Sequence, residues 1–275
     1  MTKIISTILI ATVLLLTNAP YFQITEVRAA TCDNLKAWWS MDEASGGRAD
    51  SQGSNDLTDN NTVGSAAGKV SNGADFESGN TDEYFSRADT ADLSITGDVS
   101  FAFWVNPETN GTSQFIYSKA STDTNISWYL HFQANDTVRV SYWSDGSTIS
   151  RFDTSSAVAT TTGQWIHVVV TTDISVPSTT MYINSTSVAV TDVLTAATSI
   201  QDDNSVTNIG ALNDNASIVQ EYDGIIDELS IYAGLLTQTD VNNLYNAGLG
   251  ASFDTVCGSA GAVTPKRVPP IMWMQ

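Results

Sequence analysis

Short segments in which apolar and polar residues alternate run through the middle of this 275-residue chain, divided by clusters of Gly, Asn, Asp and Ser. A period of two places the apolar side chains on one face of an extended strand. Many such segments at short spacing predict antiparallel strands that stack into a sandwich or jelly roll. The predicted strands are residues 37–41, 74–76, 84–87, 100–106, 114–119, 128–133, 138–143, 148–152, 165–172, 180–183, 187–190 and 225–232.

Turn and cap residues agree with this pattern. Asp145-Gly146 lies between two predicted strands and predicts a tight hairpin, because both turn positions need positive φ. One helix is predicted near the C-terminus, where Thr237 and Asp240 have capping-box spacing and Gly248 stands where the helix would end. The predicted fold is therefore all-β, a two-sheet antiparallel jelly-roll sandwich with one short C-terminal helix.

The chain divides into three predicted parts. Residues 1–29 are typical of a secretory signal peptide, with Lys3 ahead of an apolar run and small residues before the cleavage position. The alternative is an uncleaved membrane anchor, although the run is shorter than the roughly 20 residues that span a bilayer. Residues 30–257 form the predicted domain and residues 258–275 a flexible tail. We expect a protein that is secreted, extracellular or held at the cell surface, with no membrane span after signal cleavage.

Two cysteines, Cys32 and Cys257, bracket the patterned region. In an oxidising compartment such a pair joins the two ends of a domain, and a metal site would need more ligands than two thiols. We therefore predict a disulfide between them, and for so long a loop its entropic contribution is about 5 kcal/mol.

The charge balance excludes some classes of partner. The chain has 11 Lys and Arg residues against 30 Asp and Glu residues, a formal net charge of −19 at pH 7. Nucleic-acid binding depends on neutralising phosphates with Lys and Arg, so we expect no nucleic-acid partner. An anionic membrane surface is disfavoured for the same electrostatic reason.

Several motifs occur in an order that can be compared with a known family. They are residues 37–43 (AWWSMDE), 49–53 (ADSQG), 73–76 (GADF), 100–107 (SFAFWVNP), 163–170 (GQWIHVVV), 181–184 (MYIN) and 224–232 (GIIDELSIY). Together they resemble the laminin G-like, concanavalin A-like jelly-roll family, a relative of the pentraxins. The resemblance implies two stacked sheets whose first and last strands are adjacent. It also implies carbohydrate or protein partners, often with Ca²⁺ at the rim, and some members of the superfamily are glycoside hydrolases.

Catalysis would need a particular pair of acids. Hydrolysis of a glycosidic bond uses two carboxylates about 5 to 9 Å apart. The best candidate segment runs from Glu221 to Glu228, since related β-glucanases carry Glu-x-Asp followed closely by a second Glu. Ile225 and Ile226 occupy the positions of that second Glu, and the sequence has no Gly-x-Ser-x-Gly nucleophile motif. We predict a protein that is not an enzyme, with a glycoside hydrolase of this superfamily as an alternative.

Calcium is the cofactor that this composition allows, because Ca²⁺ takes carboxylate and carbonyl oxygens. Alternation places Asp227 on the apolar face of its predicted strand, together with Ile225 and Leu229. A carboxylate on a core face needs a compensating partner. We predict a Ca²⁺ ion shared by Asp227, Asp42 and Asp50, and hydrogen bonding of Asp227 to the backbone or to a histidine is an equal alternative.

One predicted hairpin carries the residues that suit a sugar. If strands 128–133 and 138–143 pair, their outward face shows Tyr129, His131, Gln133, Arg139 and Trp143. Aromatic faces pack against sugar C–H bonds, and planar polar groups bind hydroxyls. The alternative is that other parts of the chain cover this face and that the five are packing residues.

Two functional hypotheses follow. We prefer a secreted, non-catalytic binding module whose partner is a glycan or a cell-surface protein, supported by calcium. The second hypothesis is a structural or adhesive subunit of an extracellular surface assembly. In that case self-assembly would use the C-terminal tail, whose end at residues 269–274 is unusually apolar.

Overall fold

A computed structural model describes residues 30–79, 82–122 and 125–258. The predicted signal peptide and all but the first residue of the predicted tail lie outside the described residues, so both remain predictions. Among the described residues, no helix combines the length and the apolar character needed to cross a bilayer.

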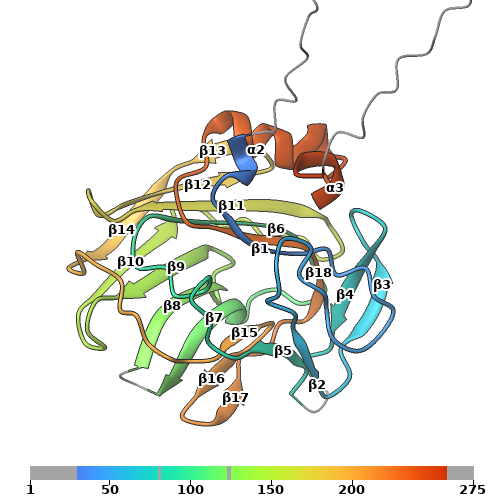
Figure 1. Cartoon of the computed structure of the whole chain (residues 1–275), viewed down its shortest axis with the longest axis horizontal. Coiled ribbons are helices and arrows are strands. Elements are labelled where there is room, and N and C mark those ends of the chain that lie inside the picture. The colour runs from blue at the N-terminus through green and yellow to red at the C-terminus, as the bar shows by residue number, and fades with distance from the viewer. Residues whose placement is uncertain (1–29, 80–81, 123–124, 259–275) are drawn as a thin grey trace, which may run out of the picture. The chain divides into compact units, whose positions relative to one another are not determined.

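Two antiparallel sheets form the structure. The first follows the order β13 (Thr186–Val188), β12 (Ser178–Ile183), β11 (Ile166–Asp173), β6 (Val99–Pro107), β18 (Gly224–Tyr232), β4 (Asn72–Phe76) and β3 (Gly64–Ala67), with β1 (Leu35–Trp39) also paired to β18. The second follows the order β14 (Val190–Thr195), β10 (Ile149–Thr154), β9 (Val138–Trp143), β8 (Asn125–Phe132), β7 (Gln114–Thr122), β15 (Thr207–Ile209), β5 (Tyr84–Arg87) and β2 (Thr58–Asn60). A small hairpin is formed by β16 (Leu212–Asp214) and β17 (Ser217–Val219). Figure 1 shows β11 and β6 above β8 and β9. The predicted two-sheet sandwich is confirmed.

The core lies between the two sheets, where alternate residues of each strand point inward. Phe101 of β6 contacts Tyr117 of β7 at 4.9 Å and Trp128 of β8 at 5.8 Å between ring centroids, so these contacts join the two sheets. All three side chains are almost fully buried. Burying apolar area of this kind is the main favourable term in folding.

Helices cover the outer face of the first sheet. They are η1 (Ala30–Cys32), α2 (Gln238–Tyr245), η2 (Asn246–Gly248) and α3 (Phe253–Val256), and Figure 1 shows α2 and α3 above β11 and β6. Val241 and Leu244 of α2 pack with Trp38 in a second apolar cluster. The predicted capping box is present: Asp240 N–H donates to the Thr237 hydroxyl at 3.3 Å, and Thr237 N–H donates to Asp240 Oδ2 at 2.8 Å.

The two ends of the domain meet. β1 pairs antiparallel with β18, and the predicted disulfide joins Cys32 to Cys257 with a Cα–Cα distance of 5.6 Å. The first and last strands are therefore adjacent, as the family resemblance implied.

A β-bulge in β18 changes the direction of one predicted metal ligand. Glu228 has φ +49°, and the register with β6 shifts between Asp227 and Ser230. Ile226 and Leu229 both belong to the core cluster, so Asp227, which pairs with Trp104, points to the outer face. The prediction that Asp227 lies on the core face was wrong, because a bulge inserts one residue and reverses the alternation beyond it.

Candidate functional site

The strand pairing brings the predicted sugar-binding residues onto one face. β8 pairs with β9 so that Tyr129 lies opposite Ser141 and His131 opposite Arg139. The inward positions of both strands belong to the core cluster, which confirms the predicted orientation. We call this surface the β8–β10 face; its residues are Tyr129, His131, Gln133, Arg139, Trp143, Arg151 and Asp153.

The aromatic part of the face is a packed cluster. The Tyr129 ring lies 5.1 Å from Phe115 and 4.7 Å from Trp143, in edge-to-face contacts. Trp143 is only 8% exposed, and it belongs to a small apolar cluster with Phe115, Ile126 and Leu212. The structure therefore makes Trp143 mainly a packing residue and leaves Tyr129 half-buried at the surface.

The polar part of the face is organised around Asp153. Its carboxylate accepts two hydrogen bonds from Arg139, at 2.6 Å from Nε and 2.7 Å from Nη2. Gln133 Nε2 donates to the same carboxylate at 2.9 Å. Bidentate Arg–carboxylate pairs of this kind have a fixed geometry. Asp153 was missed because the predicted strand ended at residue 152, although alternation around the inward Phe152 would have indicated both Asp153 and Arg151.

The ionisable groups of the face are partly desolvated. Burial, reinforced by the positive charge of Arg139, lowers the pKa of His131 to about 3, so the imidazole is neutral at pH 7. Burial also lowers the pKa of Arg151, and repulsion from Arg139 adds to that effect. The buried Nε of Arg151 has no hydrogen-bond partner.

The predicted calcium ligands each accept hydrogen bonds from the backbone of a different segment. Asp50 accepts hydrogen bonds from Trp38 N–H and Asn55 N–H, both at 3.0 Å, and Asp42 accepts one from Asn72 N–H at 2.9 Å. Across the ranges that the structure describes, no group of three His, Cys, Asp or Glu side chains is placed to hold a metal ion. Calcium at these residues remains a prediction.

Asp227 anchors the turn between β3 and β4. Its Oδ2 accepts hydrogen bonds from Lys69 N–H at 2.7 Å and Val70 N–H at 2.8 Å. This is the backbone alternative that the sequence left open for Asp227. The neighbouring Gly68 is tightly enclosed, since a Cβ there would lie 2.3 Å from Asn72 O and 2.8 Å from Asp227 Oδ2.

Gly68→Ala is expected to destabilise the domain by about 1–3 kcal/mol, because the added methyl group must displace backbone or the anchoring carboxylate. Urea unfolding measures the change. Gly97→Ala is the matched control, since a Cβ at Gly97 would meet no atom within 4 Å. Equal stability of the two variants would contradict this account of the turn.

In the glucanase-like segment, Glu221 and Asp223 are half-buried, whereas Asp227 and Glu228 are sealed from solvent. Asp227 is fully buried and Glu228 is 4% exposed, and the Trp38 indole N–H donates to Glu228 Oε2. Trp104, His167 and Leu244 close over Glu228, and the enclosed space has no room for a water molecule. A substrate therefore cannot reach this carboxylate in the folded domain.

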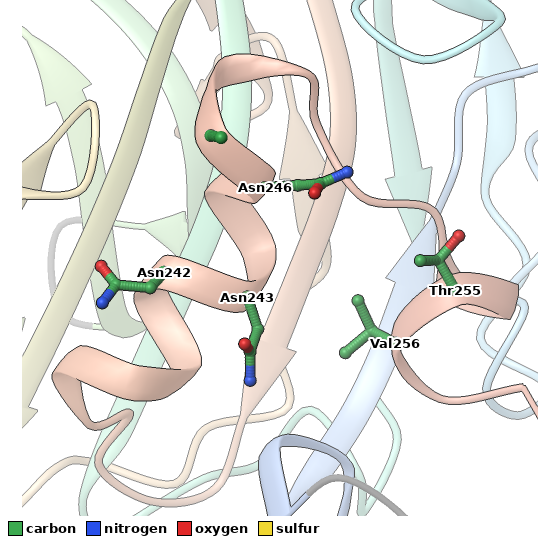
Figure 2. Close-up of a pocket in the computed structure, with 6 residues that line it drawn as sticks. Asn242, Asn243, Asn246, Thr255 and Val256 are labelled. Carbon is green, nitrogen blue, oxygen red and sulfur yellow. The ribbon is translucent and has the colours of Figure 1, made fainter.

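A hollow of about 340 Å³ between α2 and α3 is a second candidate. Figure 2 shows Asn246 of η2 extending towards α3, whereas Asn242 of α2 points away from α3. Asn246 Nδ2 already donates to Gly250 O at 2.7 Å. The described residues that line the hollow include neither an aromatic ring nor a charged group, so it lacks a surface on which a sugar ring could stack.

The two-sheet antiparallel sandwich, with its aromatic and polar outer face, has the fold of the concanavalin A-like jelly-roll proteins. Residues 78–242 match the family model described as "Concanavalin A-like lectin/glucanases superfamily", and the chain belongs to that superfamily. No curated protein matches the chain.

Solved structures share this fold. The binding domain of Paraclostridial Mosquitocidal Protein 1 is 16% identical, with TM-score 0.62, over 78% of this chain and 52% of that one. Domain 4 of AbnA, a GH43 extracellular arabinanase from Geobacillus stearothermophilus, solved with arabinotriose, is 21% identical, with TM-score 0.55, over 79% of this chain and 98% of that one. The binding domain of botulinum neurotoxin DC, solved with SialylT, is 14% identical, with TM-score 0.59, over 80% of this chain and 52% of that one. The chain thus spans about half the length of these toxin domains, and at such identities the likeness shows the fold alone.

Proposed function

We propose that the chain is a secreted, non-catalytic module that binds carbohydrate at its β8–β10 face. The observation that carries this proposal is the placement of the Tyr129 ring beside His131 and Arg139 on two paired strands. A half-buried aromatic ring gives a sugar a surface for stacking, and the fixed polar groups nearby supply direction for its hydroxyls. Because Arg139 and Gln133 are already held by Asp153, little side-chain entropy would be lost on binding.

The similar structures support a ligand of this class. Domain 4 of the arabinanase was solved with arabinotriose, and the toxin binding domain with SialylT. The binding domain of botulinum neurotoxin DC was also solved with rat synaptotagmin II, so a protein partner is the alternative ligand class.

We propose a non-catalytic module because of the surroundings of the glucanase-like segment from Glu221 to Glu228. Ile226 lies in the core and Ile225 is 8% exposed, where a glucanase would need its second carboxylate. Glu228 is enclosed by Trp38, Trp104 and Leu244.

Secretion is supported by the predicted signal peptide and by the Cys32–Cys257 disulfide, since disulfides persist in oxidising compartments. Calcium, bound by Asp42, Asp50 and Asp227, stays part of the proposal. If a bound ion shapes the rim, EDTA should weaken glycan binding by the protein.

Tyr129→Ala is expected to reduce glycan affinity about 30-fold, because truncating a central aromatic contact typically costs about 2 kcal/mol. A glycan array would identify ligands and titration calorimetry would measure their affinities. Tyr84→Ala serves as the control, since Tyr84 is also half-buried and lies on β5 of the same sheet. A wild-type protein that binds no glycan, or equal affinities for the two folded variants, would contradict the proposed function.

A further inference from the structure

Arg151 occupies a distinct position on the β8–β10 face. On β10 it lies opposite Ser141 of β9, which in turn lies opposite Tyr129 of β8. On its other side, Arg151 lies opposite Leu194 of the edge strand β14, and Leu194 is 43% exposed. Arg151 therefore lies two strands from Tyr129 on the same face, next to the edge strand β14.

The two arginines of the face differ in their partners. Both oxygens of Asp153 bind Arg139, and one of them also accepts a hydrogen bond from Gln133. Arg151 has a buried Nε–H without an acceptor. A buried donor without a partner costs free energy, and the cost is larger for a charged group.

This arrangement is notable in a protein with an excess of acids. The chain carries 30 Asp and Glu residues, and the buried Lys119 shows how it satisfies a cation, with Asp89 at 2.6 Å and Asp203 at 3.6 Å. No carboxylate is placed to bind Arg151 in this way among the described residues, where all ion pairs involve other basic side chains. With His131 neutral, Arg139, Arg151 and Asp153 leave the face one net positive charge.

We propose that the β8–β10 face binds a glycan that carries a carboxylate, such as a sialylated or uronic-acid glycan, and that Arg151 pairs with this carboxylate. A planar guanidinium matches a carboxylate with two parallel hydrogen bonds, and such charge-assisted bonds are stronger than neutral ones. Tyr129 would stack against the adjoining sugar ring. This inference rests on the proposed function, because it names the chemical class of the ligand at the same face.

The test compares ligands that differ only in the carboxylate. One pair is a sialylated glycan and its desialylated form, and another is an oligogalacturonate and its methyl ester. We expect the wild-type protein to prefer the carboxylated member of at least one pair by about tenfold or more, with the preference falling as salt is added. The pair that shows the preference distinguishes a sialic acid from a uronic acid.

Substitutions then assign the preference to a residue. Arg151→Gln should reduce it to about twofold or less, and Arg151→Lys should restore only part of it. Arg87→Gln is the matched control, because Arg87 lies on β5 of the same sheet and its buried Nε also lacks a partner. The methyl-ester comparison uses the wild-type protein, so it remains decisive if Arg151→Gln fails to fold.

The outcomes separate the two proposals. Equal wild-type affinity for charged and neutral members, or a full preference in folded Arg151→Gln, would overturn the carboxylate inference while glycan binding at Tyr129 survives. If the wild-type protein binds no member of any pair and no glycan on the array, the proposed function fails with it.

Discussion

Glu228→Gln is expected to make the domain more stable than the wild-type protein at pH 9 and to remove much of the pH dependence of its stability. Burial, together with the charge of Asp227, raises the pKa of Glu228 from 4.5 to about 9. Burial likewise raises the pKa of Asp227 from 3.8 to about 7, against the lowering effect of its hydrogen bonds from Val70 and Lys69. The folded state thus holds protons that the unfolded state releases.

The sign follows from this difference in proton binding. The two retained protons contribute fully to the free energy of unfolding below the unfolded pKa of about 4. This contribution declines as the pH rises towards 9, by about 1.4 kcal/mol per pH unit for each retained proton. Glutamine keeps an acceptor for the Trp38 indole N–H without a group that must ionise. In the variant, the free energy of unfolding should therefore fall less steeply as the pH rises. This smaller fall is caused by Asp227 alone and ends near pH 7.

Urea unfolding at pH 5, 7 and 9 measures this effect. Glu77→Gln is the control, since it removes one acid at an exposed position. A wild-type protein that is equally stable at pH 5 and pH 9 would refute the expectation, as would a Glu228→Gln variant with the wild-type slope. The same titration with Ca²⁺ tests the predicted ion, because a cation on Asp227 would favour the ionised acids and restore stability at high pH.

Loss of the disulfide is the second large effect that we expect. The paired substitution Cys32→Ser and Cys257→Ser should lower the free energy of unfolding by about 3–5 kcal/mol, because the bridge closes a loop with a sequence separation of 225 residues. The bond also holds α3 against β1, where Phe253 lies 5.9 Å from the Trp38 ring.

Reductant provides an independent check on that variant. Dithiothreitol should destabilise the wild-type protein to the level of the double variant and leave the double variant unchanged. A loss below about 1 kcal/mol in both experiments would show that β1–β18 pairing holds the chain ends without the bridge.

The longer strands could be predicted because their alternation extends over many residues. β9 has the predicted bounds, and the capping box at Thr237 is present. The strands β2, β3 and β15–β17 were missed, since segments of three or four residues are too short to display a period of two. The single predicted strand 187–190 instead spans β13 and the first residue of β14.

For the candidate site, the sequence predicted which way side chains point but not how exposed they are. Local alternation correctly placed Tyr129, His131 and Arg139 on one outward face. Exposure could not be predicted in this way, because Trp143 is buried in a cluster whose other members include Phe115 and Leu212, which are distant in the sequence. The direction of Asp227 was also lost, because a bulge at Glu228 leaves no mark in the apolar pattern.

The sequence by itself determined the class of fold, the joining of the chain ends and the outward residues of β8 and β9. Alternation, turn chemistry and cysteine placement act locally or through a single pair of residues. Only the tertiary structure decided which outward residues stay accessible and which charges find partners. Asp153 binds Arg139 with two hydrogen bonds and acts on Arg151 only through its charge, leaving the buried Nε of Arg151 without an acceptor, a difference set by strand register. Burial and pairing depend on contacts between segments that are distant along the chain, and the local pattern carries no record of them.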